Sequence, residues 1–145
     1  LDQGHILAAY AIGDIYHRGK AVAIDYPRAM AAYKIAAEAG DAFSQHQVGM
    51  MYWEGHGVAV DFEQGRPWVE KAAAQDYPAA IEALGGMCLE GEGVAPSWRR
   101  ARELYERAIE LGDSQSVQDM QILTANIANV TSSGNPPHTI PTPFA

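Results

Sequence analysis

Apolar residues along this chain fall three or four positions apart, in segments separated by short turns rich in glycine. Such spacing gathers apolar side chains such as Ile12, Ile15 and Tyr16 on one side of a helix, and it predicts helices rather than strands. Abundant alanine and few β-branched residues outside the turns favour the same interpretation. The helices expected from this spacing and from end signals cover residues 5–17, 26–39, 42–54, 62–75, 78–90, 98–111 and 114–129.

The whole pattern repeats at an offset of 36 residues without insertion or deletion, and such a period is typical of a repeat array. The recurring sets are Gly13, Gly49 and Gly85; Tyr16, Tyr52 and Cys88; Gly19, Gly55 and Gly91; Val22, Val58 and Val94; and Asp25, Asp61 and Ser97. Glycine inside a helix costs roughly 1 kcal/mol against alanine, so the first set predicts close contact between two helices. The third set predicts left-handed residues that end a helix. The fifth predicts N-cap residues, whose side chains accept hydrogen bonds from free amides.

Three features depart from this regularity. Pro67 lies inside the segment 62–75 and should kink that helix or delay its regular start, because proline removes an interior hydrogen bond; Gly65 nearby adds to the weakness. Ala21 occupies a position where the other turns have glycine, which predicts a distorted or more mobile first turn. Residues 131–145 contain four prolines and no apolar periodicity, so they predict an extended, flexible tail.

The order of residues within each repeat is a small residue, Leu/Val-Gly, Tyr, Gly-x-Gly-Val, Asp-aromatic, then Tyr and Ala-Ala. This order resembles the Sel1-like repeat, a helical-hairpin relative of the tetratricopeptide repeat. The resemblance implies an all-α fold, a right-handed α-solenoid (superhelix) of antiparallel helix pairs. The expected organisation is the end of a preceding helix at 1–4, repeats at 5–40, 41–76 and 77–112, a capping helix at 113–130 and the tail.

The charge and composition limit the classes of partner. A net charge of −8 argues against nucleic acid, which needs a basic surface, and against direct binding to an anionic membrane. The chain contains no run of 18 uncharged apolar residues, so its sequence predicts no membrane-spanning helix. The one cysteine, Cys88, excludes an intrachain disulfide framework and is interpreted as a buried thiol at a core tyrosine position. The residues themselves determine no compartment; the resemblance favours a bacterial, extracytoplasmic one.

The first helices of the hairpins usually line the concave side of such a superhelix. If residues 8, 12, 13 and 16 and their equivalents are packed, positions 10, 14 and 17 lie on the opposite side of each helix. The expected partner-binding groove consists of Tyr10, Asp14, His17, His46, Met50, Trp53, Glu82 and Leu89. Large side chains on an exposed face tend to mark binding sites, and Trp53 is the first candidate for an anchor. The alternative is a tight superhelix in which these residues contact the neighbouring helix or the tail.

No metal, cofactor or catalytic residue is predicted. His17, His46 and His56 with Asp14 lack a metal-binding spacing, and no nucleophile–base signature occurs. The resemblance implies a non-enzymatic scaffold or adaptor that binds a protein or peptide in the groove, as part of a larger regulatory or envelope-associated protein. The alternatives are an architectural spacer of a multidomain protein and an enzyme of the cell envelope.

Overall fold

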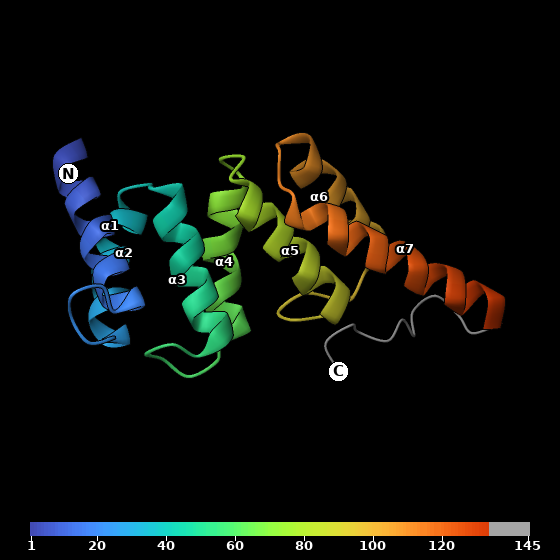
Figure 1. The fold of residues 1–145 in the computed structure, drawn as a ribbon, viewed down its shortest axis with the longest axis horizontal. Coiled ribbons are helices and arrows are strands. Elements are labelled where there is room, and N and C mark those ends of the chain that lie inside the picture. Colours follow the sequence, from blue (N-terminus) through green and yellow to red (C-terminus); the bar gives the residue numbers. More distant parts are fainter. Residues whose placement is uncertain (134–145) are drawn as a thin grey trace. The chain divides into compact units, whose positions relative to one another are not determined.

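A computed structural model describes residues 1–133, which form seven α-helices and no strand (Figure 1). The helices are α1 (Gln3–Arg18), α2 (Tyr26–Glu38), α3 (Ala42–Glu54), α4 (Phe62–Ala73), α5 (Pro78–Glu90), α6 (Trp98–Glu110) and α7 (Gln115–Ser133). The predicted all-α fold is confirmed, and every expected helix is present. Helix α7 continues four residues beyond its expected end at 129, and the predicted tail lies outside the described residues from 134 onward.

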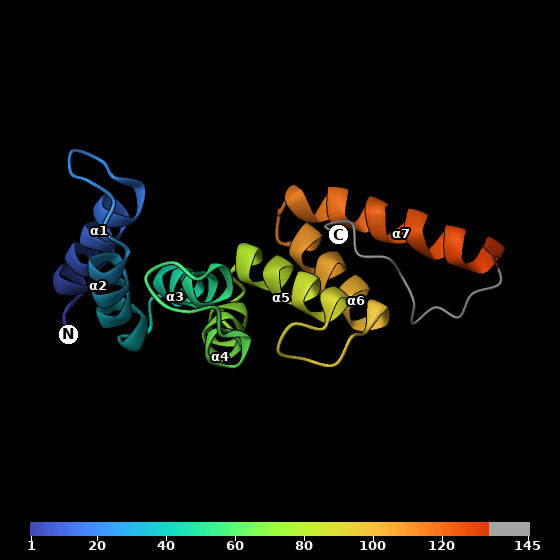
Figure 2. The same ribbon diagram turned by 90° about the horizontal axis from the view of Figure 1, so that it is seen from below.

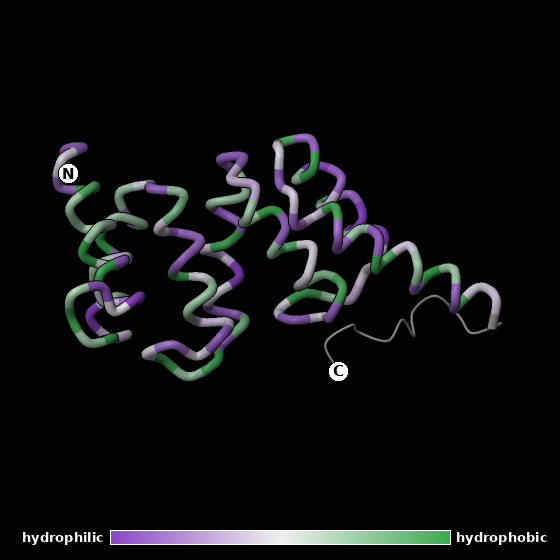
Figure 3. Tube along the Cα trace, viewed as in Figure 1, coloured by the Kyte–Doolittle hydropathy of each residue, from purple (hydrophilic) through white to green (hydrophobic). Residues whose placement is uncertain are grey.

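Consecutive helices pair as hairpins, α1 with α2, α3 with α4 and α5 with α6 (Figures 1 and 2). Residues Leu1–Tyr77 form one compact unit, in which α2 also packs on α3. Residues 78–133 form a second compact unit, in which α6 also packs on α7. Hydrophobic and hydrophilic residues are interspersed along the helices (Figure 3), so a helix can bury one side and expose another.

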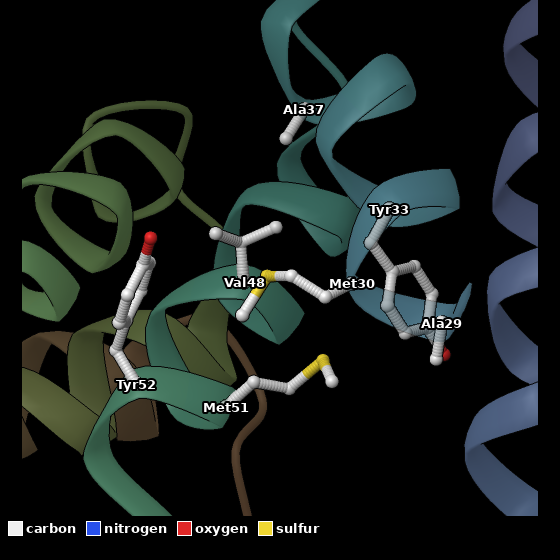
Figure 4. Packing of buried hydrophobic residues seen from close by; sticks show 7 residues of the cluster. All are labelled: Ala29, Met30, Tyr33, Ala37, Val48, Met51 and Tyr52. Atoms are coloured by element: carbon white, nitrogen blue, oxygen red, sulfur yellow. The ribbon is translucent and has the colours of Figure 1, made fainter. Parts of the chain in front are cut away.

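The core of the first unit lies between α2 and α3. Met30 and Met51 extend toward the opposite helix (Figure 4), and the buried cluster consists of Ala29, Met30, Tyr33, Ala37, Val48, Met51 and Tyr52. Two polar contacts cross the same interface. The Gln45 side-chain amide donates to the Ala37 carbonyl oxygen at 3.1 Å, and the Lys34 ammonium donates to the Tyr52 hydroxyl at 3.0 Å. This interface therefore joins one hairpin to the next.

The glycines inside α1 and α5 mark close contacts between helices, as the repeat predicts. A Cβ atom on Gly13 would lie 2.5 Å from the Tyr33 ring, and one on Gly85 would lie 2.5 Å from the Tyr105 ring. Both tyrosines are buried, so neither ring has room to move aside. A side chain at either glycine would force the two helices of its hairpin apart.

In the second hairpin the tyrosine is replaced by Val69, and the two helix backbones meet. A Cβ atom on Gly49 would collide with the Val69 side chain, and one on Gly65 would lie 2.8 Å from the Gly49 carbonyl oxygen. Gly65, expected only as a weak point, is therefore a contact residue. The delayed start expected from Pro67 is wrong: α4 is helical from Phe62 through this proline, because the Asp61 cap and the contact at Gly65 hold its first turns in place.

The caps and turns follow the repeat. The predicted N-caps are confirmed at Asp25, Asp61 and Ser97, whose side chains each accept from the amide three residues later. Gly19 and Gly55 end α1 and α3 with left-handed backbone angles, φ 69° and 74°. Ala21 adopts φ 63°, in the same region as Gly57 at 74° and Gly93 at 70°. The first turn therefore keeps the backbone shape of the other turns instead of a distorted one.

The first residues differ from the expectation for 1–4. Gln3 and Gly4 lie in the first turn of α1 rather than at the end of a preceding helix. Asp2 is the N-cap, and its carboxylate accepts from the His5 amide at 2.9 Å. A capping aspartate satisfies free amides at the start of a helix, which explains why α1 begins here.

Candidate partner-binding site

The expected groove residues lie on the first helix of each hairpin, and all of them are half-buried. Helix α1 carries Tyr10, Asp14 and His17; α3 carries His46, Met50 and Trp53; α5 carries Glu82 and Leu89. The residues of α1 and α3 belong to the first unit and those of α5 to the second. A single groove formed by all eight residues stays a prediction.

An aromatic group gathers near the N-terminal end of α3. The Tyr10 ring meets the Phe43 ring edge-on at 5.1 Å, and Phe43 lies 6.3 Å from Tyr77. His46 lies 5.4 Å from Tyr77, and burial lowers its pKa to about 4, so the imidazole is neutral at physiological pH. Sequence reasoning missed Phe43 and Tyr77, because neither occupies a groove position in the repeat.

A second aromatic group lies near the C-terminal ends of α1 and α3. The His17 ring is 5.6 Å from Tyr26 and 5.8 Å from His56, and His56 stacks on Tyr26 at 4.4 Å. Burial, and then the charge of His56, lower the pKa of His17. Packing on Tyr26 and His56 therefore keeps His17 partly covered and favours its neutral form.

The only acidic groove residue of α1, Asp14, is paired with basic side chains, and the described residues contain no cluster that could hold a metal ion. The Asp14 carboxylate pairs with Arg18 one turn later and with the Lys20 ammonium at 3.3 Å. Within residues 1–133, no three His, Cys, Asp or Glu side chains are arranged to hold a metal ion. Cys88 is buried on α5. Over the same range, no helix is long and apolar enough to cross a lipid bilayer.

Trp53 and Met50 give α3 a partly exposed apolar strip. The Trp53 ring meets Phe62 edge-on at 6.4 Å, where the chain enters α4, and it remains half-buried. His46, Met50 and Trp53 are spaced at i, i+4 and i+7, so they follow one another along one side of the helix. We call these three residues the α3 strip. Partly exposed aromatic side chains of this kind supply anchors in protein interfaces.

In the second unit, Glu82 contacts another helix. Burial, followed by the neighbouring Asp119 carboxylate of α7, raises the pKa of Glu82 to about 8, so this side chain is protonated at neutral pH. Leu89, two turns later on α5, is half-buried. Glu82 therefore contacts a neighbouring helix, which was the alternative expectation, and does not face an open groove as a charged residue.

Sequence comparison agrees with the helical repeat. The family model described as Sel1 repeat matches residues 6–41, 42–77 and 78–113. No match is found among curated proteins.

Several solved structures are similar to this chain. A protective antigen present in uropathogenic Escherichia coli strains, which displays an SLR fold, is 34% identical with a TM-score of 0.78, over 92% of this chain and 27% of that one. A Sel1 repeat protein from Oxalobacter formigenes is 30% identical with a TM-score of 0.77, over 91% of this chain and 52% of that one. The chain thus spans about a quarter and about half of these two proteins. Helicobacter pylori cysteine rich protein B, 19% identical with a TM-score of 0.64 over 80% of this chain and 89% of that one, shares the fold.

Proposed function

Because the chain belongs to the Sel1 repeat family, we propose that it is a non-enzymatic scaffold that binds a protein or peptide segment along α1 and α3. Proteins of this family are generally protein-interaction scaffolds. The observation that carries the proposal is the α3 strip, where Met50 and Trp53 remain partly exposed and the Trp53 ring meets Phe62 edge-on. A bound segment would bury these side chains further.

The chemistry of the strip indicates what it would recognise. His46 is neutral at physiological pH, and Met50 and Trp53 are apolar, so an apolar side chain of the partner is the expected anchor. Truncation of an aromatic anchor in an interface costs on the order of 2 kcal/mol or more, which is roughly a thirtyfold loss of affinity. The net charge of −8 favours a basic segment, whose association would slow as the salt concentration rises.

The test selects peptides from a displayed random library on the immobilised chain and measures their Kd by titration calorimetry. The expected result is that Trp53→Ala weakens the selected peptides by at least about tenfold and lowers the Tm by only a few degrees. Trp98→Ala, on α6 of the second unit, is the matched control and should leave the affinity unchanged.

Two results contradict the proposal. Peptides that bind Trp53→Ala and the original chain equally well would place recognition elsewhere. A library that yields no selective peptide would instead favour the architectural spacer. A large loss of helicity in Trp53→Ala would identify Trp53 as a core residue, and Met50→Ala then becomes the variant that decides.

A further inference from the structure

A contact between histidine and tyrosine rings joins the turn of the second hairpin to the first hairpin. His56, in the turn between α3 and α4, stacks on Tyr26 at the start of α2, with ring centroids 4.4 Å apart and ring planes inclined by 3°. The His17 ring, near the end of α1, lies 5.6 Å from Tyr26 and 5.8 Å from His56. We call these three residues the histidine contact. The backbones meet at the same place, since a Cβ atom on Gly57 would lie 2.8 Å from the Tyr26 carbonyl carbon.

The repeat itself requires no histidine at positions 17 and 56. The residues 36 positions later are Trp53 and Glu92, and the residue 36 positions before His56 is Lys20. Any aromatic ring would serve for stacking on a tyrosine, as the tryptophan of the next repeat illustrates. What the histidines add is a charge that depends on pH, because an imidazole ordinarily takes up a proton at about pH 6.5.

The charged groups around the contact can balance one proton but leave a second one uncompensated. The Glu54 carboxylate at the end of α3 lies 3.1 Å from the His56 Nδ1 atom and can pair with one imidazolium. The other nearby carboxylate, Asp14 of α1, already pairs with Arg18 and Lys20. Two imidazolium rings 5.8 Å apart would therefore repel each other across the contact.

The pKa of His17 agrees with this arrangement. Burial lowers this pKa first, and the charge of His56 lowers it further. A histidine whose pKa is lower in the folded chain than in the unfolded chain stabilises the fold above its ordinary pKa of about 6.5. That stabilisation is lost as the pH falls through the lowered pKa, so the contact weakens on acidification.

We propose that the histidine contact is an acid-sensitive switch, which holds the α3–α4 turn on the first hairpin at neutral pH and lets the turn separate once both imidazoles are protonated. The turn is also held by backbone hydrogen bonds to its own helix, from the His56 amide to the Met51 carbonyl oxygen and from the Asp61 amide to that of Tyr52. These bonds lie within the second hairpin, so the turn can leave Tyr26 without unfolding α3. The inference concerns a contact between two hairpins and does not rest on the proposed function.

The experiment follows nuclear Overhauser contacts between Gly57 and Tyr26 in the full chain at about pH 7.5 and about pH 5, the range in which histidine changes its charge. These contacts should be strong at the higher pH and several-fold weaker at the lower pH. His17→Phe keeps an aromatic ring and removes one of the two charges, so its contacts should persist in acid. His5→Phe is the matched control, because His5 is exposed at the start of α1 and pairs with Asp2; it should behave like the original chain.

A second measurement tests the coupling between the two imidazoles by NMR titration at low ionic strength. In His56→Phe, the titration midpoint of His17 should rise by at least about half a pH unit, which is the interaction of two unit charges at this distance in water. His46 does not interfere with either measurement, since its pKa of about 4 lies below the range that is titrated.

Three results overturn the proposal. The first is a set of Gly57–Tyr26 contacts that persists in acid in the original chain, and the second is an equal loss of these contacts in His17→Phe. The third is a His17 midpoint that stays unchanged in His56→Phe. If His17→Phe loses helicity by circular dichroism, His56→Phe takes its place in the first measurement, because it also leaves only one of the two charges.

Discussion

The contact between α3 and α4 is the most demanding packing feature of the first unit, and Gly49→Ala tests it directly. The new methyl group would collide with the Val69 side chain and would lie 3.0 Å from the Gly65 carbonyl oxygen and 3.2 Å from the Val69 nitrogen. Two of these three neighbours are backbone atoms, so relief requires movement of α4 as a whole.

The expected size of the effect follows from two opposing contributions. Alanine in a helix is favoured over glycine by roughly 1 kcal/mol. Overpacking of a close contact costs about 1–3 kcal/mol, and the upper part of that range applies when backbone must move. We therefore expect Gly49→Ala to lower the free energy of unfolding by about 1–2 kcal/mol. Urea titration followed by the fluorescence of Trp53 and Trp68, which flank the contact in the same hairpin, measures the change.

Gly4→Ala is the matched control, because Gly4 is exposed in the first turn of α1 and its added Cβ would meet only the Asp2 side chain, at 3.3 Å. That variant should be neutral or slightly more stable. Val69→Ala combined with Gly49→Ala should recover part of the loss, as a favourable coupling in a double-mutant cycle. If Gly49→Ala is as stable as Gly4→Ala, the helices do not depend on this close approach, and the reasoning from the repeated glycine is refuted.

Two further predictions concern pH. The pKa of Glu82 is raised to about 8 by burial and by Asp119, so its contribution to the stability of the second unit is complete below about pH 4.5 and lost as the pH rises through about 8. Glu82→Gln should therefore flatten this decline of stability with pH in urea titrations followed by Trp98 fluorescence. If the decline is equally steep in Glu82→Gln, the buried pair of Glu82 and Asp119 is not its cause. The pKa of His46 is lowered from 6.5 to about 4 by burial, so its contribution to the stability of the first unit is complete above about pH 6.5 and lost as the pH falls through about 4. His46→Phe should remove this acid sensitivity in titrations followed by Trp53 and Trp68, and a variant that remains equally acid-sensitive would show that other groups are responsible.

The sequence predicted the features that depend on neighbouring residues. The helices, the caps and the contact at Gly13 follow from signals that recur every 36 residues, and each signal acts within one hairpin. Apart from the contact at Gly65, the contacts that sequence reasoning missed depend on distances between hairpins. Phe43 of the second hairpin meets Tyr10 of the first, and Glu82 approaches Asp119 on α7, outside its own hairpin. Ile12 was misassigned for the same reason, since its exposure depends on which helix lies over it rather than on its place in the repeat.

The close contacts of the hairpins also limit how the repeats can be recombined. The residues that face one another set the distance between the two helices of a hairpin. Glycine faces tyrosine in the first and third hairpins, and glycine faces valine and a second glycine in the middle one. A whole hairpin could be duplicated or deleted with its matched partners intact. A crossover within the turn would join α3 to a helix with Tyr33, or α1 to a helix with Val69, so each glycine would face a side chain of a different size from its present partner. The complete hairpin is therefore the segment that can be exchanged while these contacts stay unchanged.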